Sequence, residues 1–404
     1  MKFETMRIAD LISEISMGPF GSNIKVECFV DEGIPVLNGS NLDGFVLKEN
    51  SFRYVTEEKA DSLGKANAHR GDVVITHRGT LGQIVFIPED SLYDRYVISQ
   101  SQFRVKCNEK ILPEYLVYYF HTRIGQHKLL SNASQVGVPA LARASTTFQT
   151  IEIDVPDVKS QRKIIDSLET IRRKIEVNNA INENLAEQAQ GVLYHFMEQY
   201  KYQLNPLSDI AVVIDCLHSK KPSAIEDSAY QLIQLDNIRD DGFLDMSACK
   251  YMISQADYEN WTRKCEIIEG DCVITNVGRI GAVSQAPYGT RAAMGRNMTC
   301  IRLKSDLRLQ AYFITVLLSK HMRRQIQHNT DEGTIMGALN VKNIPKLLFP
   351  IFEASIMSDL ESILYPLRKQ IEYNNLQNQN LAQIRDALLP RLMSGEMDVS
   401  DIDI

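Results

Sequence analysis

The seven cysteines are the residues of this sequence whose spacing most directly limits its chemistry. They are scattered, odd in number and never arranged as two cysteines separated by two residues. Structural zinc sites and the disulfide frameworks of small secreted domains both depend on paired cysteines. We therefore predict reduced thiols, and no metal site, at Cys28, Cys107, Cys216, Cys249, Cys265, Cys272 and Cys300.

Two short segments bounded by glycine are candidates for phosphate-binding loops. Residues 79–82 and residues 278–281 each begin and end with glycine. Neither belongs to a Gly-x-x-x-x-Gly-Lys-Ser/Thr phosphate loop, and the rest of a nucleotide-binding fingerprint is missing. Both segments follow a predicted strand, so we interpret them as tight turns that need glycine.

Two further segments are weak matches to catalytic motifs. Glu57-Glu58-Lys59 fits an acid-x-Lys pattern found in nucleases, but a solvated charge run is by far the commoner meaning of such residues. Asn205-Pro206 lacks the aromatic residue of an amino-methyltransferase motif. The chain also has no His-Glu-x-x-His zinc motif. We predict no catalytic residue and no cofactor. An enzyme with an unrecognised active site is the alternative, and it would show turnover when purified alone.

Positive charge is concentrated in two segments of an acidic chain. The formal net charge is −7, which at face value argues against a nucleic-acid partner. Residues 95–150, however, hold seven Lys or Arg against two acidic residues, and residues 291–350 hold ten against three. Each basic segment can neutralise several phosphates. A single such segment is often only a solvated helix face, but its recurrence favours a shared anionic partner. We predict DNA contacts at Arg78, His121, Arg123, Lys128, Arg143, Arg279, Arg291, Arg296, Arg323, Arg324 and Lys342.

A tandem repeat must position these residues. Ile-Glu-Val-Asn-Asn at 175–179 recurs as Ile-Glu-Tyr-Asn-Asn at 371–375, an offset of 196. Gly71-Asp72 recurs as Gly270-Asp271, and Val-Ile-Thr follows one residue later in both places. A period of about 200 residues is far longer than that of any solenoid, so each copy is the size of a domain.

Each copy divides into a globular part and a long helix. Residues 1–156 contain short β-branched and aromatic runs broken by Gly, Pro and Asn, which predict strands and turns with one helix around 114–130. From about 160 to 200 the apolar residues follow helical spacing, with no proline. The second copy predicts the same, with a helix from about 354 to 393. We therefore predict an α+β fold in four segments: 1–156, 202–351 (both globular, mixed α/β), 157–201 (first long helix) and 352–404 (second long helix and C-terminal tail).

Both long helices carry a heptad seam with asparagine at two equivalent positions, 178 and 182 in the first helix and 374 and 378 in the second. Such a seam in one helix is often ordinary core packing, but two equivalent seams favour mutual pairing. About 40 helical residues give a rod of roughly 60 Å, suited to a spacer of fixed length. Pro366 predicts a kink or a later start in the second helix. The predicted pairing residues are Ile164, Leu168, Ile171, Ile175, Asn178, Leu185, Leu360, Leu364, Leu367, Ile371, Asn374 and Leu381.

Three segments carry a resemblance to a known family. They are Gly-Pro-Phe-Gly-Ser at 18–22, the helix segment 161–179, and Leu-Leu-Pro-Arg-Leu-Met-Ser-Gly-Glu at 388–396. Together with the duplication, they make the whole chain resemble the specificity subunits of type I restriction-modification enzymes. The last segment is the most specific of the three.

The resemblance implies a division of labour. Residues 1–156 and 202–351 would be target-recognition domains, each reading half of a bipartite double-stranded DNA sequence. The long helices would pack antiparallel, set the spacing of the half-sites and bind two modification (methyltransferase) subunits, which restriction subunits would join. In this family S-adenosylmethionine and ATP are used by those partner subunits, so this chain is expected to be non-catalytic.

The second copy departs from the family pattern. It has Leu-His-Ser-Lys-Lys at 217–221 in place of Gly-Pro-Phe-Gly-Ser, and the first helix ends at 193–197 without the Pro-Arg of the second. The two domains are therefore expected to read different sequences, giving an asymmetric target.

The composition indicates where the protein is located, and one rival function remains to be considered. The mean hydropathy is −0.20, no apolar run approaches the roughly 18 residues that span a bilayer, and the first ten residues lack a signal-peptide core. We expect a cytoplasmic protein that does not enter membranes. The rival is a coiled-coil scaffold whose globular domains bind other proteins, with no affinity for DNA even when a methyltransferase partner is present.

Overall fold

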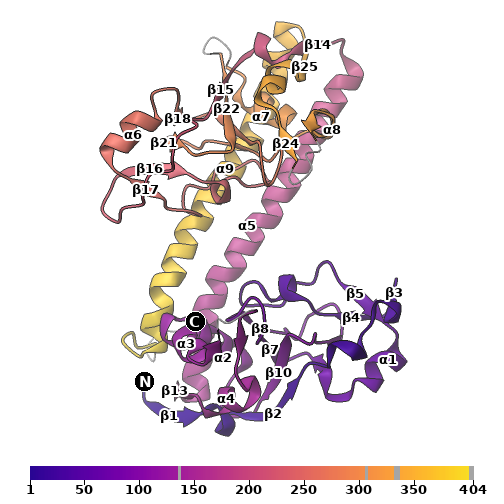
Figure 1. Ribbon diagram of the computed structural model, residues 1–404, viewed down its shortest axis with the longest axis vertical. Helices are drawn as coiled ribbons and strands as arrows, with labels where there is room; N and C mark the ends of the chain where they lie inside the picture. Colours follow the sequence, from indigo (N-terminus) through magenta and orange to yellow (C-terminus); the bar gives the residue numbers. More distant parts are fainter. Residues whose placement is uncertain (135–137, 305–307, 332–336, 400–404) are drawn as a thin grey trace. The chain divides into compact units, whose positions relative to one another are not determined.

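The computed structural model describes residues 1–134, 138–304, 308–331 and 337–399. The chain forms two compact units: the first unit contains residues 1–173 and the segment from 382 onward, and the second unit contains residues 174–381. Both boundaries fall inside two long helices, α5 (Val158–Gln199) and α9 (Ala354–Met393), so each unit holds part of both (Figure 1). The last residues of the predicted C-terminal tail, 400–404, lie outside the described residues.

The globular part of the first unit is built from short sheets. A four-stranded antiparallel sheet has the order β2-β10-β7-β8, and a five-stranded sheet has the order β3-β5-β4-β9-β6. The outer pair β1-β13 brings the two ends of this part together. The strands are β1 (Phe3–Arg7), β2 (Ile12–Met17), β3 (Phe29–Val30), β4 (Ile34–Val36), β5 (Arg53–Val55), β6 (Asn67–His69), β7 (Asp72–Thr76), β8 (Ile84–Phe86), β9 (Arg95–Val97), β10 (Gln102–Cys107), β11 (Ala133–Ser134), β12 (Ala140–Leu141) and β13 (Glu152–Pro156).

The globular part of the second unit repeats this topology. The order β15-β22-β19-β20 matches the first four-stranded sheet, and β14-β25 matches the outer pair. The other sheet has four strands, β17-β16-β21-β18. The strands are β14 (Gln203–Pro206), β15 (Ala211–Asp215), β16 (Tyr230–Ile233), β17 (Met252–Ile253), β18 (Glu266–Ile268), β19 (Cys272–Thr275), β20 (Val283–Gln285), β21 (Arg291–Met294), β22 (Met298–Leu303), β23 (Thr330–Asp331), β24 (Ala338–Leu339) and β25 (Leu348–Ile351).

Helix α2 packs on the sheet β2-β10-β7-β8 and helix α7 on β15-β22-β19-β20, whereas helix α6 packs on β16 and β21 of the other sheet. The α-helices are α1 (Glu57–Ser62), α2 (Pro113–His121), α3 (Arg123–Leu130), α4 (Ala144–Thr150), α6 (Gln255–Trp261), α7 (Gln310–Leu317) and α8 (Lys320–His328). The 3-10 helices are Ile8–Asp10, Gly21–Asn23, Val26–Cys28, Gly39–Leu42, Gly64–Ala66, Leu207–Asp209, Leu235–Asn237 and Val341–Lys346.

The single helix predicted around 114–130 is wrong, because the structure has two helices there. Thr122 adopts an extended conformation between α2 and α3, and its hydroxyl accepts a hydrogen bond from the Gly125 amide at 3.0 Å. A threonine side chain that satisfies a free amide in this way starts a new helix. Gly125 also lets α3 approach α2 closely, since a Cβ there would collide with the Tyr119 carbonyl. Ser319 plays the same capping role before α8.

The two long helices pack against each other within each unit. In the first unit Ile164 and Leu168 of α5 share a core with Leu389 and Leu392 of α9. In the second unit Leu193 of α5 shares a core with α9 residues Leu360 and Leu364. These side chains are almost fully buried. Ile171, Ile175, Leu185, Leu367 and Leu381, also predicted to pair, are half-buried, whereas Ile371 is buried.

A buried amide network fixes the antiparallel register of these helices in the second unit. Asn178 Nδ2 donates to Asn378 Oδ1 at 2.8 Å, and Asn374 Nδ2 donates to Asn182 Oδ1 at 2.8 Å. As the number rises along one helix it falls along the other, so the helices run antiparallel. Asparagine buried at seam positions specifies register at some cost in stability. The predicted fold, mixed α/β domains with two long helices packed together, is confirmed.

Pro366 does not start the second helix. Helix α9 begins at Ala354 and continues through the proline to Met393. Proline removes one backbone hydrogen bond inside a helix. The buried neighbours Leu360 and Leu364 hold this part of α9 against the second unit's core, which compensates locally for the missing bond.

Candidate nucleic-acid interface

The repeated Gly-Asp segment builds the same buried ion pair in both units. Gly71 has φ of +80° and places Asp72 under the sheet, where its carboxylate accepts the His69 amide at 2.9 Å. Arg104 on the neighbouring strand β10 lies 3.2 Å from Asp72 and donates to Glu14 at 2.9 Å. The Arg104 side chain is 6% exposed. Burial raises the pKa of Asp72, and the nearby Arg104 opposes that rise.

The second unit repeats this arrangement with Gly270, Asp271 and Arg302. Gly270 has φ of +84°, and the Asp271 carboxylate accepts the Ile268 amide at 2.9 Å. Arg302 donates two hydrogen bonds to Asp271, at 2.7 and 2.6 Å. Two arginines counted in the basic segments therefore serve the fold, and the positive charge available at the surface is smaller than the sequence suggested.

Three chain segments meet at one edge of the four-stranded sheet in the first unit, and we call them the first loop edge. They are the turn 77–82 after β7, the loop 99–101 before β10, and residues 138–143. The Gly79 amide donates to the Pro139 carbonyl at 2.9 Å, and the His77 amide donates to the Ser101 carbonyl at 2.8 Å. The predicted DNA contacts Arg78 and Arg143 are exposed on two of these segments. Arg143 has a left-handed backbone (φ +47°), unusual for a residue with a side chain.

The Gly-Pro-Phe-Gly-Ser segment lies against the same edge. The Gly18 amide donates to the Gln102 carbonyl at 2.8 Å, and a Cβ at Gly18 would collide with the Ser99 carbonyl. A Cβ at Gly21 would collide with the Gln100 side chain. Gly18 is therefore needed for close packing, whereas the exposed Gln100 side chain can move away from a Cβ at Gly21. The ring of Phe20, between the two glycines, is 82% exposed.

The second unit has an equivalent edge, the second loop edge, formed by residues 276–281, 295–297 and 337–342. The Asn276 amide donates to the Asn297 carbonyl at 2.8 Å, and the Leu339 amide donates to the Asn276 carbonyl at 2.8 Å. Three predicted DNA contacts, Arg279, Arg296 and Lys342, lie here and are exposed. The turns are glycine-bounded as predicted, with positive φ at both ends of 79–82 and of 278–281.

Not all three of these side chains are equally available. Arg279 donates to the Ile238 carbonyl at 2.9 Å and pairs with Asp240 at 2.6 Å, although its side chain is still 49% exposed. Arg296 and Lys342 have no side-chain hydrogen bond or ion pair among the described residues, so they can meet an anion without breaking one.

Position 296 has a counterpart that reasoning on charge alone missed. In the first unit Gln100 stands one residue before Ser101, and Arg296 stands one residue before Asn297; the two carbonyls accept equivalent turn amides. Both side chains are exposed. Glutamine pairs well with adenine and arginine with guanine in the major groove. The sequence could have indicated this position, because Gln100 lies just before the buried strand β10 and one repeat offset, 196 residues, before Arg296.

Other predicted contacts lie away from the loop edges. Arg123 is exposed beside a separate cavity that Phe3 and Met393 also line. Arg323 and Arg324 are exposed on α8, without a side-chain hydrogen bond or ion pair within the described part of the chain. Helix α8 is tied to its loop edge because Ile326 packs where a Cβ at Gly281 would be.

Two predicted contacts, His121 and Lys128, are engaged inside the protein. The His121 ring stacks on Phe45 at 4.2 Å and bonds the Ile84 carbonyl at 2.9 Å, and burial lowers the pKa of this histidine. Lys128 donates to the Glu152 carbonyl at 2.6 Å. These geometries give both side chains a packing role.

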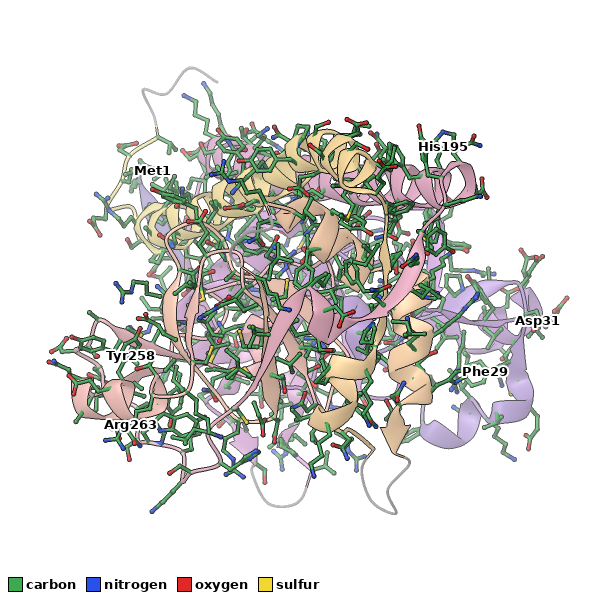
Figure 2. The ribbon with its side chains drawn as sticks, turned by 90° about the horizontal axis from the view of Figure 1, so that it is seen from above. Met1, Phe29, Asp31, His195, Tyr258 and Arg263 are labelled. Atoms are coloured by element: carbon green, nitrogen blue, oxygen red, sulfur yellow. The ribbon has the colours of Figure 1, made fainter. Side chains whose placement is uncertain are left out.

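Arg291 belongs to the other sheet of the second unit. It binds the Glu266 carboxylate through two hydrogen bonds of 3.0 Å, and that bonding lowers the pKa of Glu266. Tyr258 donates to the same carboxylate at 2.6 Å. Figure 2 shows Tyr258 close to Arg263, where helix α6 ends, so this group forms a surface feature of its own.

Two groups of possible metal ligands have their ligand atoms close together. Cys265, Asp271 and Cys300 are buried with their ligand atoms within 4.8 Å of one another. Asp271 is already bound by Arg302, whose positive charge opposes a cation at this place. Asp215, Cys216 and His218 form the second group, with His218 Nε2 at 2.8 Å from Asp215.

Among the described residues no helix is long and apolar enough to cross a membrane.

The chain is similar in sequence to a known protein family and to two known proteins. Residues 2–187 match the family described as the type I restriction modification DNA specificity domain. The chain is 22% identical, over 99% of its length and 94% of the relative's, to the type I restriction enzyme MjaIX specificity subunit of Methanocaldococcus jannaschii. It is 19% identical to the HindI specificity subunit of Haemophilus influenzae, over 88% of this chain and 93% of that one.

A solved structure shares the fold. The S subunit of a type-I restriction-modification system from M. genitalium superposes with a TM-score of 0.53 at 14% identity, covering 97% of this chain and 96% of that one. At this level of identity the likeness concerns the fold alone.

Proposed function

This chain belongs to the specificity subunits of type I restriction-modification systems, and we propose that its two globular parts read the two halves of a bipartite DNA target. It is a DNA specificity subunit and not itself a catalyst. The observation that carries the proposal is the pair of equivalent loop edges, which share one backbone arrangement and differ in their exposed side chains. Equivalent frames with different surface residues suit two readers of different sequences.

We propose separate roles for the exposed side chains. Arg78, Arg143, Arg279 and Lys342 bind phosphates and hold the loop edges against double-stranded DNA, because phosphate contacts set register without reading sequence. Arg123, Arg323 and Arg324 add backbone contacts farther from the edges. Gln100 and Arg296 read base edges in the major groove. His121 and Lys128 leave the proposed interface because their polar groups are already bonded within the protein. Arg291 leaves it because it lies on strand β21 of the other sheet, outside the segments of the second loop edge.

We also propose the partners. A chain that directs modification and restriction without catalysis must act through other subunits. Each unit contains part of both long helices, so each has an equivalent helical surface to which a partner subunit can bind. Two modification (methyltransferase) subunits bind there, one per unit, and restriction subunits join through that core. The paired helices set the spacing between the half-sites, with the asparagine network fixing their register. We place the protein in the cytoplasm, where its DNA and partners are.

The test is co-expression of the chain with its modification subunit, followed by single-molecule sequencing of methylated DNA. We expect a bipartite, asymmetric methylated motif that disappears when this chain is omitted. Arg296→Ala should relax one half of the motif only. Arg263→Ala serves as the matched control, since Arg263 is exposed in the same unit and lies next to α6, outside the loop-edge segments. Methylation that does not change when the chain is omitted would refute the proposal, and would favour a protein-binding scaffold.

A further inference from the structure

Arg368 of α9 is a half-buried arginine whose side chain has no hydrogen bond or ion pair among the described residues. Its Nε is buried without a hydrogen bond, and no carboxylate among the described residues lies within ion-pair distance. Asp241 and Glu372 influence it only from farther away, and burial lowers the pKa of its guanidinium. Buried polar groups in native proteins are nearly always bonded, and leaving one unbonded costs stability. Such a group needs an explanation.

The first unit shows what is missing. Arg172 of α5 stands at the equivalent position, at the offset of 196, and its Nε donates to the Glu169 carboxylate at 2.9 Å. Tyr118 donates to that carboxylate at 2.7 Å. In the second unit Tyr365 occupies the position of Glu169, and its side chain is 51% exposed. Both copies of the repeat therefore have the arginine, but only the first has the carboxylate.

The space beside Arg368 is a cavity of about 350 Å³. Polar atoms of Gln285 and Gln310 line it, together with the apolar side chains of Phe243 and Ala286. A cavity of this size, with an apolar wall and a few polar groups, is typical of small-molecule sites at the lower end of their range.

The charges around the cavity select the kind of ligand. Lys369 also lines it, but Lys369 is neutralised by Glu372 at 2.8 Å. Glu269 on the rim adds negative charge. Arg368 therefore supplies one positive charge without an adjacent counter-ion, which suits a singly charged anion better than a dianion. The planar fork of an arginine matches a carboxylate in two parallel hydrogen bonds.

We propose that this cavity binds the anion of a small free carboxylic acid, whose carboxylate is bound by the guanidinium group of Arg368. The apolar wall formed by Phe243 and Ala286 accommodates a short hydrocarbon group attached to that carboxylate. The site lies within the second unit and does not depend on DNA recognition.

The test titrates the purified full-length chain with acetate, butyrate and benzoate by ligand-detected NMR and calorimetry, at constant ionic strength. We expect one site for monocarboxylates and weaker binding of inorganic phosphate at a pH where it is a dianion. Arg368→Gln should raise the dissociation constants at least about tenfold, because it removes charge-assisted hydrogen bonds. Tyr365→Glu should abolish binding and raise the thermal midpoint of the ligand-free protein, since it restores the carboxylate of the first unit.

The control is Tyr373→Glu, which makes the same substitution at another exposed tyrosine of α9 that does not line the cavity. It should leave carboxylate binding unchanged. The proposal is overturned if no monocarboxylate binds the wild-type chain at tens of millimolar, or if chloride and phosphate bind as well and Arg368→Gln changes nothing. It is also overturned if Arg368→Gln affects only assembly with the modification subunit, which would assign the site to a partner's acidic side chain.

Discussion

The two units share a buried frame and differ at their edges and along their helices. Asp72 with Arg104 and Asp271 with Arg302 make the same ion pair beneath the same sheet. At the loop edges the equivalent positions hold Gln100 in one unit and Arg296 in the other. The residues that pair beneath the surface are alike in the two units, whereas the exposed residues at the loop edges differ. Each prediction below tests one side of this contrast.

The largest effect is expected from breaking the shared frame. Arg104→Ala should lower the free energy of unfolding by about 3–5 kcal/mol, because Asp72 and Glu14 lose the charge that compensates them. Arg302→Ala should cost less, since the Arg302 side chain is 34% exposed against 6% for Arg104. Urea unfolding followed by circular dichroism measures the whole chain, and Trp261, the single tryptophan, reports on the second unit. Losses below about 1 kcal/mol in both variants, the size expected of a surface pair, would contradict a shared frame.

The next effect concerns the divergent loop edges. Gln100→Ala and Arg296→Ala should each weaken DNA binding by about 1–3 kcal/mol, and each should relax one base of a different half-site. Gln100→Arg should shift the preferred base in its half-site from adenine towards guanine. Competition binding with single-base variants of the methylated motif measures both. If either variant weakened binding equally for all sequences, its residue would bind phosphate, and positions 100 and 296 would not explain why the two units read different bases.

A smaller effect is expected from the arginines outside the edges. Replacing Arg323 and Arg324 together by alanine should reduce the slope of log affinity against log salt by about 2, and Arg123→Ala should reduce it by about 1. Sequence preference should not change in either variant. The measurement is affinity at four salt concentrations, with the methyltransferase subunit present throughout. An unchanged slope in the double variant would remove α8 from the proposed interface.

The smallest effect is a difference in acid sensitivity. Burial lowers the pKa of His77 and His121 in the first unit, where the second unit has Asn276 and Leu318. A histidine with a lowered folded-state pKa contributes stability above its ordinary value of 6.5, and that stability is lost as the pH falls below 6.5. Between pH 7.5 and 5.5 the first unit should therefore weaken more than the second. Circular dichroism compared with Trp261 fluorescence during unfolding checks this, and His121→Leu should reduce the difference.

The sequence predicted features that depend on local pattern and on the repeat. The bounds of α9 follow from its periodic apolar residues between Glu353 and Ser394, and the loop-edge turns follow from paired glycines. The break at Thr122 was missed because an apolar helical pattern continues across it, and only a side-chain cap interrupts the backbone. Pro366 was overrated because Leu360 and Leu364 before it and Ile371 after it are buried, and their packing outweighs one lost hydrogen bond.

The candidate site was harder to predict because charge in a sequence does not show which charges are used internally. Arg104, Lys128 and Arg291 look alike in composition, yet each is bonded to a residue far away in the chain. Gln100 carries no charge and was therefore not considered. Its position became visible only when the turn hydrogen bonds aligned the two copies. Pairing across the fold, more than residue type, decides which side chains are free to bind a partner.

The composition of the first unit has a consequence for the time course of synthesis. Leu389, Leu392 and Met393 belong to its core, and Gly395 is packed against Phe3. Those residues leave the ribosome only after the whole second unit has been made. The first unit is thus translated first but completed last. Until residues 382 onward have been made, its core lacks the side chains that this segment contributes. Ribosome stalling or truncation near residue 381 would therefore leave the first unit without its last segment, while the second unit would be complete.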